Sequence, residues 1–266
     1  GPWTYVRELF NRAVNSPFHN RTWPTICGNQ GRGCFNPRMV QRPSDGKWIL
    51  SFNAPDDLAT YNANGYYFMG CDSISGPCGN GSATGSTVKP ALYLCNGAED
   101  FSIVENGPTA YMLCVDRDRK LRLEQLDGCW CNGINVGAIG LGGLQYVEGE
   151  DLIQTAEGWL LIYGSNCPYC AGTDTSYAIA ASILGPYTAP AAGRRRISGY
   201  SCGGQSRTVT EVPDGTYVLI DTWHGGNNET TAQLRLEPLV RTAAPLLATP
   251  DGSPFSTPAF EPFTCA

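Results

Sequence analysis

The most constraining feature of the sequence is a unit that recurs four times: a turn containing glycine, then an aromatic residue within a short apolar strand. A spacing of roughly 50 to 60 residues is typical of one supersecondary unit used several times, as in propellers and solenoids. In a ring of such units, loops from every unit converge at one end, and we expect the ligand site there. The four copies span residues 45–50, 106–113, 157–162 and 214–219.

Each unit continues into a further strand, and in two of them this strand alternates between apolar and polar residues, at 120–126 and 232–236. Alternation with a period of two predicts antiparallel strands with one face in water. The 32 glycines and 19 prolines favour many short strands joined by turns over helices. We therefore predict an all-β, disulfide-rich protein, a five-bladed β-propeller that forms a single domain over residues 1–266. The alternative is a four-bladed ring that irregular N- and C-terminal segments close.

The chain has 12 cysteines, which indicates a disulfide-rich protein from an oxidising compartment. Three pairs lie close in sequence and suit local staples, and Cys265 could fasten the C-terminus, although the sequence does not fix the connectivity. Cys129 and Cys131 could supply zinc ligands together with Cys167 and Cys170. The spacing of these four cysteines does not fit a zinc ribbon, so we predict no metal. The three close pairs are Cys27 with Cys34, Cys71 with Cys78, and Cys167 with Cys170.

Three N-glycosylation acceptor motifs, at Asn20, Asn80 and Asn228, agree with a secreted, extracellular protein. No apolar run reaches the length of a membrane span, and we expect a mature chain that begins after removal of a signal peptide. The net charge of −6 argues against a nucleic-acid partner, which requires clustered basic residues. We expect a monomer whose partner is a polysaccharide or an oligosaccharide.

A resemblance to a known family becomes specific at residues 145–240. The segment 147–154, followed after a glycine turn by 159–165, resembles the blade of glycoside hydrolase family 43 that carries a glutamate. The segment 201–206 is similar to the Gly-Ser-Gln segment of the exo-β-1,3-galactanase branch, and 96–104 resembles that branch's Arg-Asp strand, with Glu99 where arginine is usual. The resemblance covers about 200 residues. It implies a five-bladed propeller that acts on plant or fungal polysaccharide.

The resemblance also implies roles for individual residues. Glu148 would be the general acid that protonates the leaving oxygen, with Glu150 as the fallback. Asp100 would hold the geometry of that acid, and Gln205 would position the attacking water. Inverting glycosidases separate the acid and the base by roughly 6.5–9.5 Å. An amide orients water but accepts no proton, so Gln205 leaves the base unidentified.

Aromatic and polar residues near these positions are the candidate substrate contacts, because aromatic faces stack on sugar rings and imidazoles bind hydroxyl groups. An ordinary core or loop role is the alternative for each of them. The family also allows a Ca²⁺ ion on the ring axis, but no dedicated carboxylate loop is present. The predicted substrate contacts are Trp130, Glu150, Tyr169, Trp223 and His224.

The sequence departs from the family at the residue that serves as the catalytic base. The family carries an aspartate, usually before proline, in its first blade, whereas the N-terminus here resembles the end of that blade and most of it is absent. Asn36-Pro37 has the outline of this motif but carries asparagine. Loop carboxylates that could serve instead are Asp56, Asp57 and Asp72.

We therefore predict a secreted glycoside hydrolase that cleaves a β-linked, galactan-like polysaccharide with a glutamate as general acid. Two alternatives remain open: a carbohydrate-binding propeller without catalysis, and an enzyme that cleaves polysaccharide by a non-hydrolytic route on the same scaffold. A fold alone does not decide among such activities.

Overall fold

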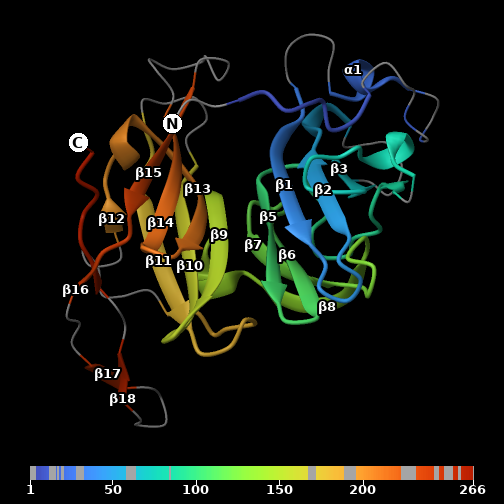
Figure 1. Cartoon of the computed structure of the whole chain (residues 1–266). Coiled ribbons are helices and arrows are strands. Elements are labelled where there is room, and N and C mark those ends of the chain that lie inside the picture. Colours follow the sequence, from blue (N-terminus) through green and yellow to red (C-terminus); the bar gives the residue numbers. More distant parts are fainter. Residues whose placement is uncertain are drawn as a thin grey trace. The chain divides into compact units, whose positions relative to one another are not determined.

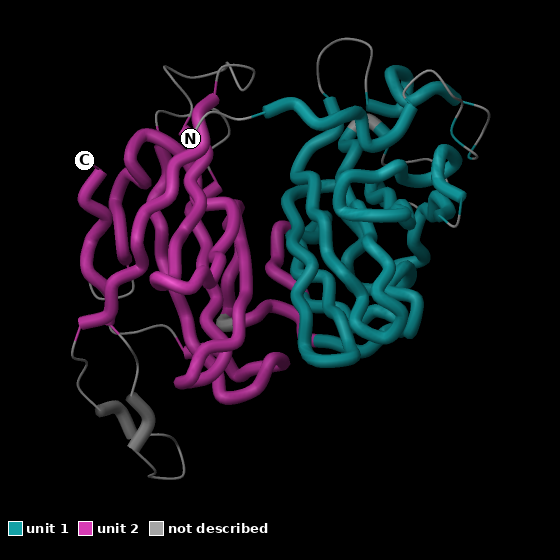
Figure 2. Tube along the Cα trace, in the orientation of Figure 1, with its two compact units in different colours: residues 1–118, 123–137 teal, residues 119–122, 138–266 magenta. Residues whose placement is uncertain are grey.

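In the computed structural model, the regular secondary structure of the described residues is almost entirely β-strand (Figure 1). The chain divides into two compact units, residues 1–118 with 123–137, and residues 119–122 with 138–266 (Figure 2). The structure describes residues 4–11, 16, 18, 21–27, 33–57, 64–83, 85–166, 172–188, 196–222, 232–242, 246–248, 254–256 and 259–265.

The first unit contains two four-stranded antiparallel sheets, each in the order of the chain. A short helix, α1 (Trp23–Ile26), precedes them, and single 3₁₀ turns lie at Pro55–Asp57 and Gly79–Gly81. We call the sheets blade 1 and blade 2. Residues 121–122 of β7 (Leu121–Leu126) and 138–139 of β8 (Gly133–Ile139), two strands of blade 2, are grouped with the second unit. Blade 1 consists of β1 (Phe35–Gln41), β2 (Trp48–Asn53), β3 (Tyr66–Cys71) and β4 (Thr87–Val88), and blade 2 of β5 (Phe101–Asn106), β6 (Thr109–Val115), β7 (Leu121–Leu126) and β8 (Gly133–Ile139).

The second unit contains blades 3 and 4, with 3₁₀ turns at Leu141–Gly143 and Ser201–Gly203. Two short strand pairs follow blade 4: β16 (Arg241–Thr242) with β19 (Ala259–Phe260), and β17 (Leu246–Ala248) with β18 (Pro254–Ser256). Blade 3 consists of β9 (Val147–Thr155), β10 (Gly158–Ser165), β11 (Thr175–Ala180) and β12 (Arg196–Ser198), and blade 4 of β13 (Gly204–Val212), β14 (Gly215–Thr222) and β15 (Gln233–Pro238).

The four repeated glycine turns predicted from the sequence are the first hairpins of the four blades. In each blade the aromatic-bearing segment after the turn becomes the second strand, namely β2, β6, β10 and β14. The propeller arrangement of four blades is thus the predicted alternative, and the five-bladed prediction is not confirmed. The described part of the C-terminal region forms two-stranded pieces of two or three residues instead of a fifth sheet.

Each unit buries its own apolar core. In the first unit, Trp23 from α1 packs against Phe52 of β2 and Tyr67 of β3, with ring centroids 5.7 and 5.3 Å away. In the second unit, Tyr177 of β11 and Ile220 of β14 are 1% and 0% exposed within one cluster. Alternate residues of adjacent strands supply these clusters, as expected for stacked antiparallel sheets.

Five disulfides join described cysteines, and two of them, Cys27–Cys34 and Cys71–Cys78, are among the three close pairs named from the sequence. Cys202–Cys265 fastens the C-terminal segment. Cys95–Cys114 joins the segment before β5 to β6, and Cys129–Cys131 lies between β7 and β8. Cys167 and Cys170 lie outside the described residues. No helix in the described part of the chain is long and apolar enough to cross a membrane.

Candidate functional site

Each blade carries a polar side chain at the same place, the end of its first strand that lies away from the hairpin turn. In the second unit, Glu148 and Gln205 are the second residues of β9 and β13 and pair with Gly164 and Asp221. In the first unit, Asn36 is the second residue of β1, and Asp100 immediately precedes β5. The fold therefore places a polar residue at this position in all four blades.

In the second unit, Glu148 lies between two amides. The Gln205 Nε2 atom donates a hydrogen bond of 3.0 Å to Glu148 Oε2, and the Asn166 Nδ2 atom donates to Glu148 Oε1. Gln205 is 1% exposed, whereas Glu148 is half-buried. The two donors hold the carboxyl group in one orientation and leave part of it accessible to solvent. The structure thus brings together two of the three predicted catalytic residues.

A bulge in β9 determines where Glu148 points. Gly149 and Glu150 of β9 together face the single residue Tyr163 of β10. Gly149 has φ +61°, and a Cβ atom there would lie 2.0 Å from the Ser206 backbone oxygen. Only glycine combines that backbone conformation with such a close approach of β9 to β13. The bulge therefore places Glu148 beside the adjacent blade.

Replacing Gly149 with alanine is expected to cost more than 2 kcal/mol of unfolding free energy, roughly 1–2 from the positive φ and the rest from the contact with Ser206. Gly140 is the matched control in the same unit, because it has φ +65° but no atom within 4 Å of the position that a Cβ atom would take. Gly140→Ala should cost only the backbone part. Chemical denaturation measures both, and equal losses would contradict the packing role of Gly149.

Asp174 stabilises the end of β10, next to Asn166. Its Oδ1 atom accepts a 2.8 Å hydrogen bond from the Ser165 backbone N–H, and its Oδ2 atom accepts one of 3.0 Å from Ser176 Oγ. Burial raises the pKa of Asp174, but these hydrogen bonds and the nearby Arg196 outweigh it and leave the pKa below its ordinary value. Asp174 is therefore an anionic support for the strand end that carries Asn166.

In the first unit, Asp100 is paired with an amide in a corresponding way. The Asn36 Nδ2 atom donates to Asp100 Oδ1 over 2.7 Å and approaches Asn53 Oδ1 at 3.2 Å. Asn36 has φ +50° and lies in an irregular stretch between Phe35 and Arg38 of β1. Like the bulge at Gly149, this irregularity re-aims a polar side chain at the strand end.

Trp130 does not form a subsite wall. It is 1% exposed, belongs to the core cluster of the first unit, and donates from Nε1 to the Pro108 carbonyl over 3.3 Å. The large apolar area of an indole makes burial favourable, and the prediction that Trp130 binds substrate is wrong. Glu150, within β9, is 1% exposed, so its carboxyl group is buried, whereas Glu148 is half-buried.

The loop carboxylates differ in environment. Asp57 is fully buried and paired with Lys89 and Arg21, so it is no candidate base. Asp72 is exposed and accepts hydrogen bonds from Ser82 Oγ and the Ala83 N–H. The side chain of Asp56 lies outside the described residues.

Several predicted site residues lie outside the described part of the chain, and their roles stay predictions. These are the substrate contacts Tyr169, Trp223 and His224, and the glycosylation acceptors Asn20 and Asn228. Asn80 is described and lies exposed in the 3₁₀ turn Gly79–Gly81.

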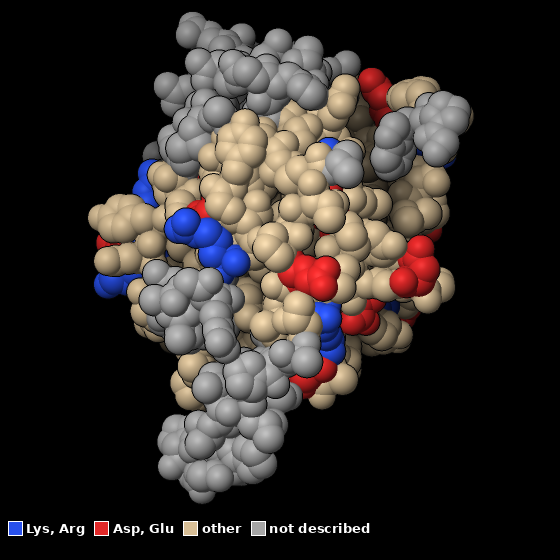
Figure 3. All heavy atoms as spheres, turned by 90° about the vertical axis from the view of Figure 1, so that its left-hand side faces the viewer, with Lys and Arg blue, Asp and Glu red and all other residues tan. Residues whose placement is uncertain are grey.

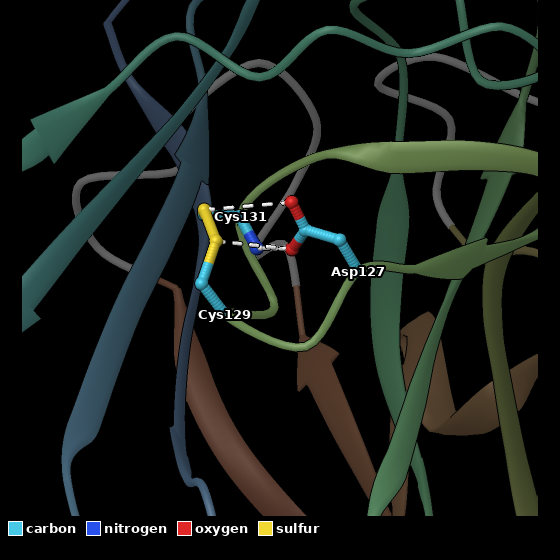
Figure 4. A group of neighbouring side chains, drawn as sticks. All are labelled: Asp127, Cys129 and Cys131. Atoms are coloured by element: carbon cyan, nitrogen blue, oxygen red, sulfur yellow. Dashed lines mark hydrogen bonds between the residues drawn. A yellow bond between two sulfur atoms is a disulfide. The ribbon is translucent and has the colours of Figure 1, made fainter.

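One group of potential metal donors is present among the described residues: Asp127, Cys129 and Cys131, whose donor atoms lie within 4.8 Å of one another. Figure 4 shows that the two sulfur atoms are bonded to each other, next to the Asp127 carboxylate. Zinc binds thiolates, and a disulfide offers none. Asp127 instead accepts hydrogen bonds from the backbone N–H groups of Cys131 and Asn132.

On the molecular face shown in Figure 3, acidic and basic side chains are interspersed among uncharged residues.

Two residues that contact predicted catalytic residues, one in each unit, were not themselves predicted as site residues. Asn36 could have been found from the repeat itself, because it occupies the blade position that Asp100, Glu148 and Gln205 occupy in the other blades. Asn166 carries no comparable sequence signal. Its contact with Glu148 depends on the backbone conformation immediately after β10, and no local sequence pattern predicts that conformation.

Comparison with solved structures finds similar folds in β-1,3-galactanases and a β-1,3-galactosidase. The exo-β-1,3-galactanase from Phanerochaete chrysosporium, solved with galactose, aligns with a TM-score of 0.64 and 14% identity over 96% of this chain and 53% of that one. A GH43 β-1,3-galactosidase solved with galactodeoxynojirimycin gives 0.64 and 13% over 94% and 80%. An exo-β-1,3-galactanase from Clostridium thermocellum gives 0.61 and 15% over 86% and 48%.

These similarities show the fold, which is the propeller of family 43 galactanases. The chain spans about half the length of the Phanerochaete and Clostridium enzymes. Comparisons with protein-family models and with curated protein sequences find no match.

Proposed function

We propose that this chain is a glycoside hydrolase that cleaves a β-1,3-linked galactan, with Glu148 as the general acid. The observation that carries the proposal is the half-buried Glu148 carboxyl group held between Asn166 and Gln205 at the first strand of blade 3. The fold shared with enzymes described as β-1,3-galactanases supports the substrate class.

A glycosidase lowers its barrier by giving a proton to the leaving oxygen while water attacks the anomeric carbon. Two fixed amide donors orient the Glu148 carboxyl group, and such positioning is what a general acid requires. Gln205 lies too close to Glu148 for a sugar between the two groups in this structure. Its first role is therefore to orient Glu148, and it would position the attacking water once substrate separates them. Asp100, whose Oδ1 atom accepts a hydrogen bond from Asn36, stays a predicted catalytic residue of the first unit.

A second candidate function is carbohydrate binding without catalysis. One observation favours it: two of the four equivalent blade positions, Asn36 and Gln205, carry amides that accept no proton. Amides and carboxylates bind sugar hydroxyl groups equally well in a lectin and in an enzyme.

A substrate screen separates the two functions. Purified protein is incubated with β-1,3-galactan, β-1,4-galactan, β-1,3-glucan and xylan, and released sugar is measured by chromatography. The hydrolase proposal expects galactose from β-1,3-galactan and no product from the protein with Glu148→Gln. Retention on the polysaccharide in affinity electrophoresis with no product from any substrate would instead establish the lectin function.

The chain would act as a secreted, extracellular monomer. Five disulfides among the described cysteines and the exposed acceptor Asn80 support the secreted location. Protein secreted from a eukaryotic host is expected to carry a glycan at Asn80, so Asn80→Gln and Ser82→Ala should each remove the same mass. Glycopeptide mass spectrometry checks this, and an unmodified Asn80 peptide would contradict it.

A further inference from the structure

Tyr146 combines three properties that an ordinary surface tyrosine does not share. It is 60% exposed, it immediately precedes β9, and its backbone has φ +57°. Its hydroxyl group makes no hydrogen bond to any residue that the structure describes. A bulky side chain at positive φ is a genuine outlier, because its Cβ atom then lies too close to the following carbonyl oxygen.

The surrounding backbone imposes this conformation on Tyr146. Its N–H donates to the Arg119 carbonyl over 2.8 Å, and its carbonyl accepts the Asn166 N–H over 2.9 Å. The Lys120–Gln145 bridge fixes the preceding residue. Strain that surrounding contacts over-determine is concentrated at binding and catalytic sites.

Asn166 links Tyr146 directly to the proposed acid. Its backbone N–H holds the Tyr146 carbonyl, while its side chain holds the Glu148 carboxyl group. Tyr146 and Glu148 are two residues apart, a span of at most about 7 Å of chain. An exposed aromatic residue thus lies two positions along the chain from the carboxylate–amide cluster, and Asn166 forms hydrogen bonds with both.

Apolar ring faces and nearby hydroxyl-binding groups together match a pyranose, which has an apolar C–H face and a rim of hydroxyls. We infer that Tyr146 is the aromatic platform on which a galactosyl ring of a β-linked galactan packs next to Glu148. The role of Tyr146 rests on the proposed function, since it names a contact for the same substrate class.

Calorimetric titration with β-1,3-galactotriose tests this role, with the Glu148→Gln variant as parent so that no substrate is consumed. Adding Tyr146→Ala should weaken binding by roughly threefold to tenfold, whereas Tyr146→Phe, which keeps the ring, should bind within about twofold of the parent. Tyr217→Ala is the matched control, because Tyr217 lies four pairs along the β13–β14 ladder from the Gln205–Asp221 pair; it should bind like the parent. Equal affinity of the Tyr146→Ala protein and its parent would overturn the inference, as would equal losses in Tyr146→Ala and Tyr146→Phe.

Thermal unfolding adds a second readout. Because glycine adopts positive φ freely, Tyr146→Gly should unfold at a temperature equal to or above that of Tyr146→Ala while losing the same affinity. A lower unfolding temperature for the glycine variant would contradict the strain at this position. The binding assay is independent of turnover: galactotriose binding that depends on Tyr146, without released galactose, would reject hydrolysis and retain the platform. Turnover that depends on Glu148 but not on Tyr146 would retain hydrolysis and reject the aromatic platform.

Discussion

Glu148→Gln is expected to lower kcat/KM on β-1,3-galactan by about 10²- to 10⁴-fold, the usual contribution of a general acid. The amide keeps the shape of the side chain but carries no transferable proton, and one of its two amide neighbours, Asn166 or Gln205, must turn its oxygen toward the new NH₂ group. A leaving group that needs no proton should reveal the difference. On a dinitrophenyl β-galactoside, the same variant should keep most of its activity, and steady-state kinetics on the two substrates measures this contrast.

The control for this prediction is Glu157→Gln. Glu157 belongs to the same blade but lies in the β9–β10 hairpin turn, at the opposite end of β9 from Glu148. Its partner Arg241 is an exposed residue, so losing this pair should change stability little. Equal losses of activity on both substrates in Glu148→Gln would show that Glu148 supports the site without donating the proton.

Asp57→Ala is expected to reduce the free energy of unfolding by about 3–5 kcal/mol, the range for breaking a buried ion pair from one side. Asp57 and Lys89 have fully buried side chains, and Lys89 Nζ lies 3.1 Å from Asp57 Oδ2. Tyr67 donates its hydroxyl hydrogen to Asp57, and Arg21 binds the other oxygen. Removing the carboxylate leaves the Lys89 ammonium group buried without its anion.

The pH dependence of this loss has a definite sign. Burial lowers the pKa of Lys89 from 10.5, and Asp57 opposes that shift. Without Asp57 the folded-state pKa falls further, so the unfolded chain binds more protons than the folded one between that value and 10.5. The variant should therefore regain part of its stability as the pH rises through this window.

Two further variants identify the cause of this loss. Asp45→Ala removes the partner of Arg42 on the surface of the same unit and should cost less than about 1 kcal/mol. Combining Asp57→Ala with Lys89→Met should cost less than the sum of the two single changes, because the buried charge is gone. Strict additivity in urea denaturation would contradict the ion-pair account.

Much of the fold was predictable because its signals are local. Glycine turns followed by apolar, aromatic-bearing strands, such as 45–50 and 157–162, became the first hairpins of the blades. The number of blades was not predictable in the same way. It depends on how the weakly patterned ends pair, and β16 and β19 join over only two residues.

The candidate site was predictable where it follows the repeat. Glu148 and Gln205 contact each other because the same strand position recurs in neighbouring blades. Trp130 was misassigned because the sequence does not distinguish a buried indole from an exposed one. Tyr146 and Asn166 were missed because backbone hydrogen bonds between distant segments hold them in place.

The position of bound substrate relative to residue 148 tests the central claim most directly. In a crystal structure of the Glu148→Gln protein with β-1,3-galactotriose, a glycosidic oxygen should lie within hydrogen-bond reach of the side chain at position 148, about 2.6–3.2 Å away. A trisaccharide bound elsewhere, or with every glycosidic oxygen beyond the reach of that side chain and of one bridging water, would contradict the account.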